Sequence, residues 1–218
     1  MSYQVAIDGP AGAGKSTIAK KVAKTKGFIY VDTGAMYRAM AYHMCQQKIN
    51  LTDADAIANE ALNADISIKY IDGEQVVLLN GENVNAFLRT EEVGNAASVT
   101  SQNPRVRERL TFLQKKLASE NDVVMDGRDI GTCVLPNADV KIYLTASSGV
   151  RAKRRYDELL AKGETADIEK IEADIIQRDH QDMTREISPL KQAEDAVLLD
   201  SSDMDIEEVT NKILSYIK

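Results

Sequence analysis

Residues 9–16 read Gly-Pro-Ala-Gly-Ala-Gly-Lys-Ser, and this octapeptide matches the phosphate-binding pattern G-x-x-x-x-G-K-[ST] at every fixed position. Residues 3–8 have the composition of a short strand, and Ile18, Ala19 and Val22 then recur at helical spacing. Glycines allow the backbone N–H groups to turn inward around a polyphosphate, and the following helix adds its N-terminal dipole. The sequence therefore predicts a phosphate-binding loop between a strand and a helix.

The residue types inside the loop fit phosphate chemistry. Lys15 can reach the β- and γ-phosphates of a nucleotide, and the Ser16 hydroxyl can hold Mg²⁺. Asp126 follows the apolar residues 123–125, where the second acidic residue of such proteins helps to hold the metal. The simpler alternatives are a glycine-rich turn without a ligand and an ordinary turn aspartate. The residues expected to bind the nucleotide phosphates are Gly9, Pro10, Ala11, Gly12, Ala13, Gly14, Lys15, Ser16 and Thr17.

Length and composition limit the classes of protein to consider. The 218 residues suffice for one α/β domain with an insertion. The net charge of −7 argues against a general nucleic-acid or membrane-surface binder, and no apolar run reaches the ~18 residues of a membrane span. Cys45 and Cys133 lie far apart without metal-ligand spacing, which is typical of the reducing cytoplasm. We expect a cytoplasmic protein that works as a monomer and binds neither nucleic acid nor membrane.

Predicted strands alternate with predicted helices along most of the chain. Short apolar strands are expected at 28–31, 123–125, 140–144 and 196–199. The predicted helices cover 35–47, 53–63 with Thr52 as its cap, a stretch from Pro104, 149–162, 167–181 and 206–217. This alternation predicts an α/β fold of the P-loop NTPase type, with a parallel sheet between helices on both faces.

Residues 63–90 interrupt the alternation. Ile66, Ile68 and Tyr70 alternate with polar residues, as in a half-buried strand. Asp72-Gly73 and Asn80-Gly81 are strong turn signals on either side of a second apolar run. We expect an antiparallel β insertion within a single domain that spans residues 1–218, because so few residues bury too little core to fold alone.

Arginines follow the ends of two predicted strands. Arg38 comes one helical turn after the strand that ends at Asp32, and Arg128 follows Asp126 directly. Ligands of open α/β sheets bind at the carboxyl ends of the strands, so these cations indicate a second anion beside the first. Either arginine alone is also compatible with an ordinary surface position.

Further arginines cluster in the last third of the chain. Arg151, Arg154 and Arg155 open one predicted helix, either as a solvated basic face or as a lid over residues 150–164 that closes on phosphates. Arg178, Asp182 and Arg185 then follow at spacings that allow them to converge. Two neighbouring phosphates, converging arginines and no acid–base dyad are typical of phosphoryl transfer, which mainly requires positioning and charge neutralisation.

Several longer strings narrow the interpretation: the phosphate loop from Asp8 to Thr17, DTGAMYR at 32–38, NAAS at 95–98, PRVR at 104–107, DGRDIGT at 126–132, and Arg185 before Ser188-Pro189-Leu190. With these strings the chain resembles, over essentially its whole length, the bacterial cytidylate kinases of the nucleoside monophosphate kinase family. The phosphate loop alone would indicate only a superfamily, whereas DTGAMYR and DGRDIGT are much narrower.

The resemblance implies that ATP, with Mg²⁺ bound by Ser16 and Asp126, phosphorylates CMP or dCMP. It also implies that the β insertion is the extra subdomain of the bacterial members and that the helix after residue 150 is a mobile lid. Transferred to this chain, the functional residues would be Ser98, Arg107 and Asp129 at the cytosine; Arg178 and Asp182 at the sugar; Arg38, Arg128, Arg185 and Thr33 at the acceptor phosphate; Arg151 at the ATP phosphates; and Lys15, Arg128, Arg154, Arg155 and Arg185 in catalysis.

Two other classes of function stay open from the sequence. The first is a different P-loop kinase, acting on thymidylate, adenylate or a non-nucleotide alcohol. The second is a nucleotide-dependent switch without enzymatic activity, although a switch has no need of arginines for a second phosphate.

Overall fold

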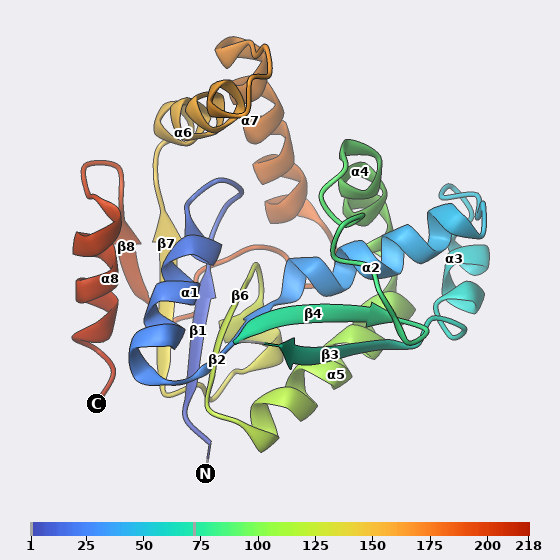
Figure 1. The fold of residues 1–218 in the computed structure, drawn as a ribbon, viewed down its shortest axis with the longest axis horizontal. Coiled ribbons are helices and arrows are strands. Elements are labelled where there is room, and N and C mark those ends of the chain that lie inside the picture. Colours follow the sequence, from blue (N-terminus) through green and yellow to red (C-terminus); the bar gives the residue numbers. More distant parts are fainter. Residues whose placement is uncertain (1, 72) are drawn as a thin grey trace. The chain divides into compact units, whose positions relative to one another are not determined.

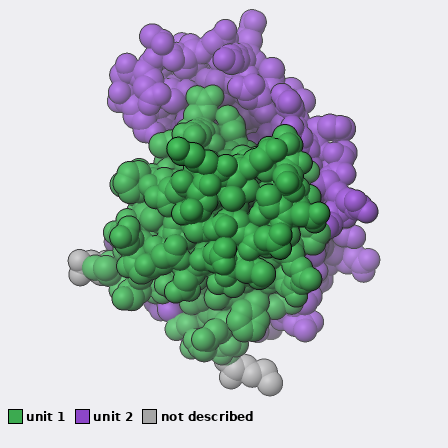
Figure 2. Space-filling model, turned by 90° about the vertical axis from the view of Figure 1, so that its right-hand side faces the viewer, with its two compact units in different colours: residues 1–2, 31–121 green, residues 3–30, 122–218 purple. Residues whose placement is uncertain are grey.

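The computed structural model describes residues 2–71 and 73–218, and these form two compact units. Unit 1 comprises residue 2 and residues 31–121, and unit 2 comprises residues 3–30 and 122–218 (Figure 2). Unit 2 is therefore assembled from two separate stretches of the sequence, whereas unit 1 comes almost entirely from one.

A parallel sheet with the strand order β2-β6-β1-β7-β8 forms the frame of unit 2. Its strands are β1 (Gln4–Asp8), β2 (Ile29–Asp32), β6 (Val123–Gly127), β7 (Val140–Thr145) and β8 (Val197–Asp200), and the last two residues of β2 belong to unit 1. The register pairs Asp8 with Gly127 on one side and with Tyr143 on the other. The chain moves to one side of β1 on the way to β2 and to the other side on the way to β7, so the end of β1 is the switch point of the sheet.

The helices of unit 2 are α1 (Lys15–Lys26), α6 (Ser148–Ala161), α7 (Ile168–Thr184) and α8 (Ile206–Leu214), with a short π-type turn η1 (Ile130–Val134) after β6. Helices α1 and α8 pack together beside the sheet (Figure 1). Their apolar faces and the strands form one core that includes Ile7, Val22, Ile142 and Ile213. Helices α6 and α7 pack side by side as a hairpin.

Unit 1 is mainly helical, with a small antiparallel sheet. It contains α2 (Thr33–Gln46), α3 (Ala54–Glu60), α4 (Glu91–Thr100) and α5 (Pro104–Glu120), and the sheet order is β3 (Ile66–Ile71), β4 (Glu74–Leu79), β5 (Glu82–Asn83). Helix α2 packs against α4, α5 and β4. Its three methionines, Met36, Met40 and Met44, are all buried in this packing.

The predicted fold class is confirmed by the parallel sheet and by the antiparallel insertion. The predicted Asn80-Gly81 turn is confirmed by positive φ at both residues, 51° and 86°, as a two-residue hairpin turn requires. Asp72 lies outside the described residues. The register that pairs Ile71 with Glu74 confirms that β3 and β4 are antiparallel neighbours.

Several predicted boundaries were wrong. Helix α2 begins at Thr33 instead of 35, because the Asp32 side chain accepts from the Ala35 N–H at 2.8 Å and caps the helix. Asp53, not Thr52, caps α3, which ends at Glu60 where the chain passes into turns. Helix α8 ends at Leu214, three residues before the predicted end at residue 217. Within the described ranges, no helix combines the length and the apolar character that a membrane crossing requires.

Candidate active site

The phosphate loop connects β1 to α1, as the sequence predicts. Gly9 has φ 151°, and a Cβ at this position would lie 1.9 Å from the Leu144 carbonyl oxygen, so only glycine fits. Gly14 precedes α1 with φ 83° and provides no side-chain cap. The first N–H groups of α1 therefore point into the loop without a capping side chain, which is the arrangement that binds an anion at a helix N-terminus.

Lys15 is buried inside the loop. Its Nζ donates to the Pro10 carbonyl at 2.7 Å, so the ammonium closes the loop on itself. Burial lowers the pKa of Lys15 well below its usual range, and the nearby Arg128 charge lowers it further. The carboxylates of Asp126, Asp8 and Asp182 oppose this shift. A polyphosphate in the loop would supply the negative charge that this buried cation lacks.

Ser16 and Asp126 lie together beside the loop. The Ser16 hydroxyl donates to Asp126 Oδ2 at 2.8 Å, and the Tyr30 hydroxyl donates to Oδ1 at 2.9 Å. Hard oxygen ligands suit Mg²⁺, which is usually held by one or two protein oxygens together with phosphates and waters. The described residues contain no cluster of three or more His, Cys, Asp or Glu side chains that could hold a metal alone. The pair therefore fits a magnesium ion that arrives with a nucleotide.

Arg151 and Asp179 hold the tip of the phosphate loop. Arg151 donates to the Ala11 carbonyl at 2.8 Å and to the Ala146 carbonyl at 2.8 Å, and it pairs with Asp179 at 2.7 Å. Asp179 in turn accepts from the Ala11 N–H at 3.3 Å. Arg151 is thus a buried anchor between α6, α7 and the loop in this structure, and its predicted contact with ATP phosphates stays a prediction.

The other two arginines of α6 have separate partners. Arg154 donates to the Ser201 carbonyl at 2.7 Å, near the end of β8. Arg155 is about half exposed and pairs with Glu158 at 3.0 Å. The three predicted lid arginines therefore do not share one partner: Arg151 is buried, Arg154 is partly buried against Ser201, and Arg155 is exposed.

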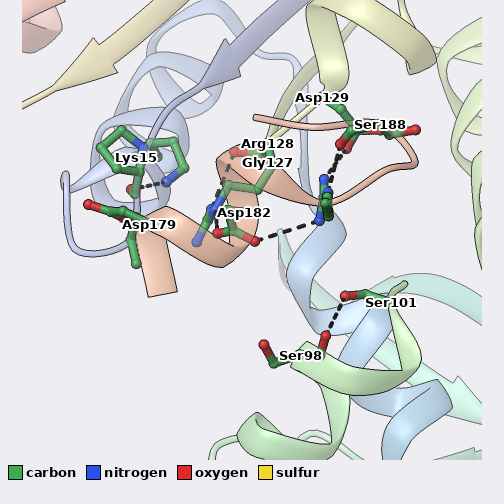
Figure 3. Close-up of polar contacts among 12 residues, drawn as sticks. Lys15, Ser98, Ser101, Gly127, Arg128, Asp129, Asp179, Asp182 and Ser188 are labelled. Atoms are coloured by element: carbon green, nitrogen blue, oxygen red, sulfur yellow. Dashed lines mark hydrogen bonds and ion pairs between the residues drawn. The ribbon is translucent and has the colours of Figure 1, made fainter. Parts of the chain in front are cut away.

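A charged cluster lies at the end of β6 (Figure 3). Arg128 Nε donates to Asp182 Oδ2 at 2.8 Å. Arg185 lies 3.6 Å from Asp182 and 3.7 Å from Asp129, and its Nε donates to the Ser188 carbonyl at 2.7 Å. Arg178 lies exposed on α7, one turn before Asp182. The structure thus brings Asp182 and Arg185 together, two of the three residues predicted to converge, and Arg128 and Asp129 lie beside them.

In unit 1, Arg38 pairs with the residue that caps its own helix. Its Nη2 lies 3.2 Å from Asp32 Oδ2, and the side chain is partly exposed. Thr33 is buried in the first turn of α2. This pair orients a guanidinium at the N-terminal end of the helix, where the backbone N–H groups also favour an anion.

Ser98 and Arg107 lie on consecutive helices of unit 1. The Arg107 guanidinium is buried, lies 5.4 Å from the centre of the Tyr37 ring, and donates to the Ser101 carbonyl at 3.2 Å. The Ser101 hydroxyl donates to the Ser98 carbonyl at 3.2 Å. This network fixes the orientation of the predicted base-reading arginine.

Sequence reasoning missed three residues that support the site in unit 2: Asp8, Tyr30 and Asp179. Asp8 is buried at the end of β1, and it accepts from the N–H groups of Ile130 and Gly131 at 2.8 and 2.7 Å. The position of Asp8 directly before the phosphate loop could have indicated that it supports the site. Tyr30 and Asp179 carried no such signal, because their partners are far away in the sequence.

Comparisons with known proteins agree with this geometry. The sequence model of the cytidylate kinase family matches residues 5–218. A cytidylate kinase from Geobacillus sp. (strain WCH70) is 49% identical over 216 residues, which is 99% of this chain and 96% of the relative. A cytidylate kinase from Listeria welshimeri is 52% identical over 97% of this chain and 94% of the relative.

A solved structure of an uncharacterized protein from Eubacterium ventriosum has the same general fold, with a TM-score of 0.52 and 13% identity over 99% of this chain and 98% of that one. The family assignment itself rests on the sequence relatives. Because the family model matches nearly all of its length and its relatives are about 50% identical in sequence, this chain belongs to the cytidylate kinase family.

Proposed function

We propose that this protein transfers the γ-phosphate of ATP to CMP or dCMP, giving ADP and CDP or dCDP. Within unit 2, one observation carries the proposal beyond nucleotide binding. The register pairs Asp8, directly before the phosphate loop, with Gly127, directly before Arg128, and the Arg128 charge lowers the pKa of the buried Lys15. Two cations of like charge held so near each other at the switch point of the sheet favour two neighbouring phosphate groups, a donor and an acceptor.

The donor side is formed by the phosphate loop. Its backbone N–H groups and Lys15 would bind the ATP phosphates, and Ser16 and Asp126 would hold Mg²⁺. When bound, Mg²⁺ neutralises charge on the phosphates. Lys15 has to leave the Pro10 carbonyl to reach the phosphates, and its desolvated charge then acts on the transferring group without further loss of water.

On the acceptor side, Arg38, Arg128 and Arg185 would bind the monophosphate with Thr33 near them, and Arg178 and Asp182 would bind the sugar. Asp182 already orients Arg128 through its 2.8 Å contact. Because phosphoryl transfer requires little proton chemistry from the protein, these residues act by positioning and charge neutralisation.

Arg154 and Arg155 would act from the lid. In this structure Arg154 donates to the carbonyl of the buried Ser201, and Arg155 pairs with the exposed Glu158. Exchange of these partners for ATP phosphates would close the lid, exclude water and limit wasteful hydrolysis of ATP.

Base choice would rest on Asp129 and Arg107, with Ser98. Cytosine offers an amino donor at its 4-position and acceptors at N3 and O2, and a carboxylate and a guanidinium complement this pattern. Uracil reverses the first two groups, so a carboxylate would face a carbonyl oxygen and the guanidinium an N–H. Two reversed contacts of ~1.5–3 kcal/mol each predict at least about a hundredfold preference for CMP over UMP in kcat/KM.

A panel of acceptors in a coupled ADP-release assay tests the proposal. CMP, dCMP, UMP, AMP, dTMP and a small alcohol would be compared at saturating MgATP. The proposal predicts that CMP and dCMP are the best acceptors. A better rate with dTMP or AMP would favour another P-loop kinase, and slow ATP turnover that no monophosphate accelerates would favour a nucleotide switch.

The setting proposed for this activity is the cytoplasm, with the enzyme as a monomer. The acidic net charge and the absence of closely spaced cysteines support it. Sedimentation of the purified protein at micromolar concentration tests the monomer, and a dimer at that concentration would overturn it.

A further inference from the structure

The N-terminus of η1 is capped in an unusual way. In seven helices of the described chain the residue at the N-cap position caps its own helix, and in four of them it is an aspartate: Asp32, Asp53, Asp167 and Asp205. Asp129 occupies the same position before η1, yet its side chain makes no capping hydrogen bond. The usual role of an aspartate at this position is therefore not used here.

Asp8 provides the cap instead, from a different strand. Its Oδ1 accepts from the Ile130 N–H at 2.8 Å and its Oδ2 accepts from the Gly131 N–H at 2.7 Å. These are the first two N–H groups of η1, which would otherwise lack partners. Gly131 permits the approach, since a Cβ there would lie 3.3 Å from Asp8 Oδ2 and 3.2 Å from Lys141 Cδ.

With the cap supplied by Asp8, the Asp129 side chain makes no capping hydrogen bond to η1. Its carboxylate lies 3.7 Å from Arg185 Nη2, within the charged cluster at the end of β6. We propose that Asp8 is a positioning residue that caps η1 in place of Asp129 and thereby keeps the Asp129 carboxylate directed at the base of the acceptor nucleotide. The proposal rests on the proposed function, because it assumes that Asp129 reads the base.

Asp8 also connects the phosphate loop with the loop that follows β6. It is the residue directly before Gly9, so one carboxylate fixes both the start of the phosphate loop and the loop that carries Arg128 and Asp129. A residue with only a structural role would affect every acceptor alike. A residue that orients Asp129 changes the preference between acceptors that differ only in the base.

The test measures kcat/KM for CMP and for UMP in Asp8→Asn, Asp8→Ala and Asp129→Ala. Asparagine keeps one acceptor oxygen and turns its amide N–H₂ toward the second backbone N–H, whereas alanine removes both contacts. In either variant, Asp129 becomes the nearest carboxylate to the backbone N–H groups that have lost their cap. We expect Asp8→Asn to lower the CMP to UMP ratio of kcat/KM about tenfold and Asp8→Ala about a hundredfold; a loss shared by both acceptors, through the phosphate loop or Arg128, leaves this ratio unchanged.

The double variant Asp8→Asn/Asp129→Ala separates the two roles. If Asp8 acts through Asp129, the double variant has the same CMP to UMP ratio as Asp129→Ala alone, because the orienting effect has nothing left to orient. Gly131→Ala disturbs the same contact from the other side, and we expect it to shift the ratio in the same direction. It keeps the test decisive if Asp8→Ala does not fold.

Asp139→Asn is the matched control. Asp139 also accepts a backbone N–H from β1, that of Gln4 at 2.8 Å, but at the opposite end of the strand. It should leave the CMP to UMP ratio unchanged. Equal losses for CMP and UMP in Asp8→Asn and Gly131→Ala, with a wild-type enzyme that prefers CMP and an Asp129→Ala variant that loses this preference, would overturn the proposal. A wild-type enzyme without a preference for CMP would instead overturn the proposed base reading.

Discussion

The ion pair between Arg151 and Asp179 makes a quantitative prediction about stability. The two side chains are only 6% and 12% exposed and lie 2.7 Å apart. Removal of one partner of a buried pair leaves the other charge uncompensated and costs about 3–5 kcal/mol. Arg151→Met also removes the hydrogen bonds to the carbonyls of Ala11 and Ala146. We therefore expect this substitution to lower the free energy of unfolding by at least about 3 kcal/mol.

Urea denaturation of the nucleotide-free protein measures this loss, because bound nucleotide would add its own binding free energy to the folded state. With an m-value of about 3 kcal/mol/M, a loss of 3 kcal/mol lowers the midpoint by about 1 M. Asp179→Leu should cost a similar amount. The double variant Arg151→Met/Asp179→Leu should lose less free energy of unfolding than the two single variants lose together, since it buries no unpaired charge.

Arg155→Met is the control from the same helix. Arg155 and Glu158 are about half exposed, and an exposed pair of this kind contributes at most about 1 kcal/mol. A midpoint for Arg151→Met as close to wild type as that of Arg155→Met would refute the anchoring role. So would strictly additive effects of the Arg151 and Asp179 substitutions.

Three further predictions concern catalysis, motion and pH. Lys15→Ala should fold and lose about 10²–10³ in kcat, since it removes a charge aimed at the transferring group; turnover near that of wild type would contradict the role of the loop. Amide hydrogen exchange around residues 150–164 should slow when ATP and CMP analogues are both bound, and identical exchange with and without them would argue against a lid. Burial raises the pKa of Asp8 to about 6 from 3.8, so its contribution to stability is complete below pH 3.8 and declines as the pH rises through 6. Asp8→Asn should therefore gain about 1 kcal/mol relative to wild type between pH 5 and 7.5, and a difference in the free energy of unfolding that is independent of pH would be inconsistent with that pKa.

Much of the fold follows from local sequence. The phosphate loop was evident because its glycines and its lysine meet strict backbone and charge requirements within eight residues. The β insertion was evident because Asn80 and Gly81 meet the positive φ of a hairpin turn. The start of α2 was missed, although the aspartate at position 32 is a strong helix cap.

The support of the site was harder to predict, since it depends on contacts between distant parts of the chain. Asp8 reaches its partners across 122 and 123 residues of sequence. From its place in a basic cluster, Arg151 was predicted to lie either on a solvated basic face or in a lid that closes on phosphates. Arg151 is buried because it contacts Asp179 on the next helix and Ala11 in the phosphate loop. The hydrophobic periodicity of the sequence does not predict contacts between such distant residues.

The division of unit 2 into two sequence segments has a consequence for the order of folding. Strand β1 pairs only with strands about 119 and 135 residues further along the chain, as in the pairs Gln4–Val123 and Val5–Val140. Closing loops of this length is slow because the entropy is lost before the contacts form. The hairpins and helices of residues 31–121 have much closer partners. We therefore expect this middle segment to gain amide protection first during refolding, and β1, which leads into the phosphate loop, to gain it only when β6 and β7 pair with it.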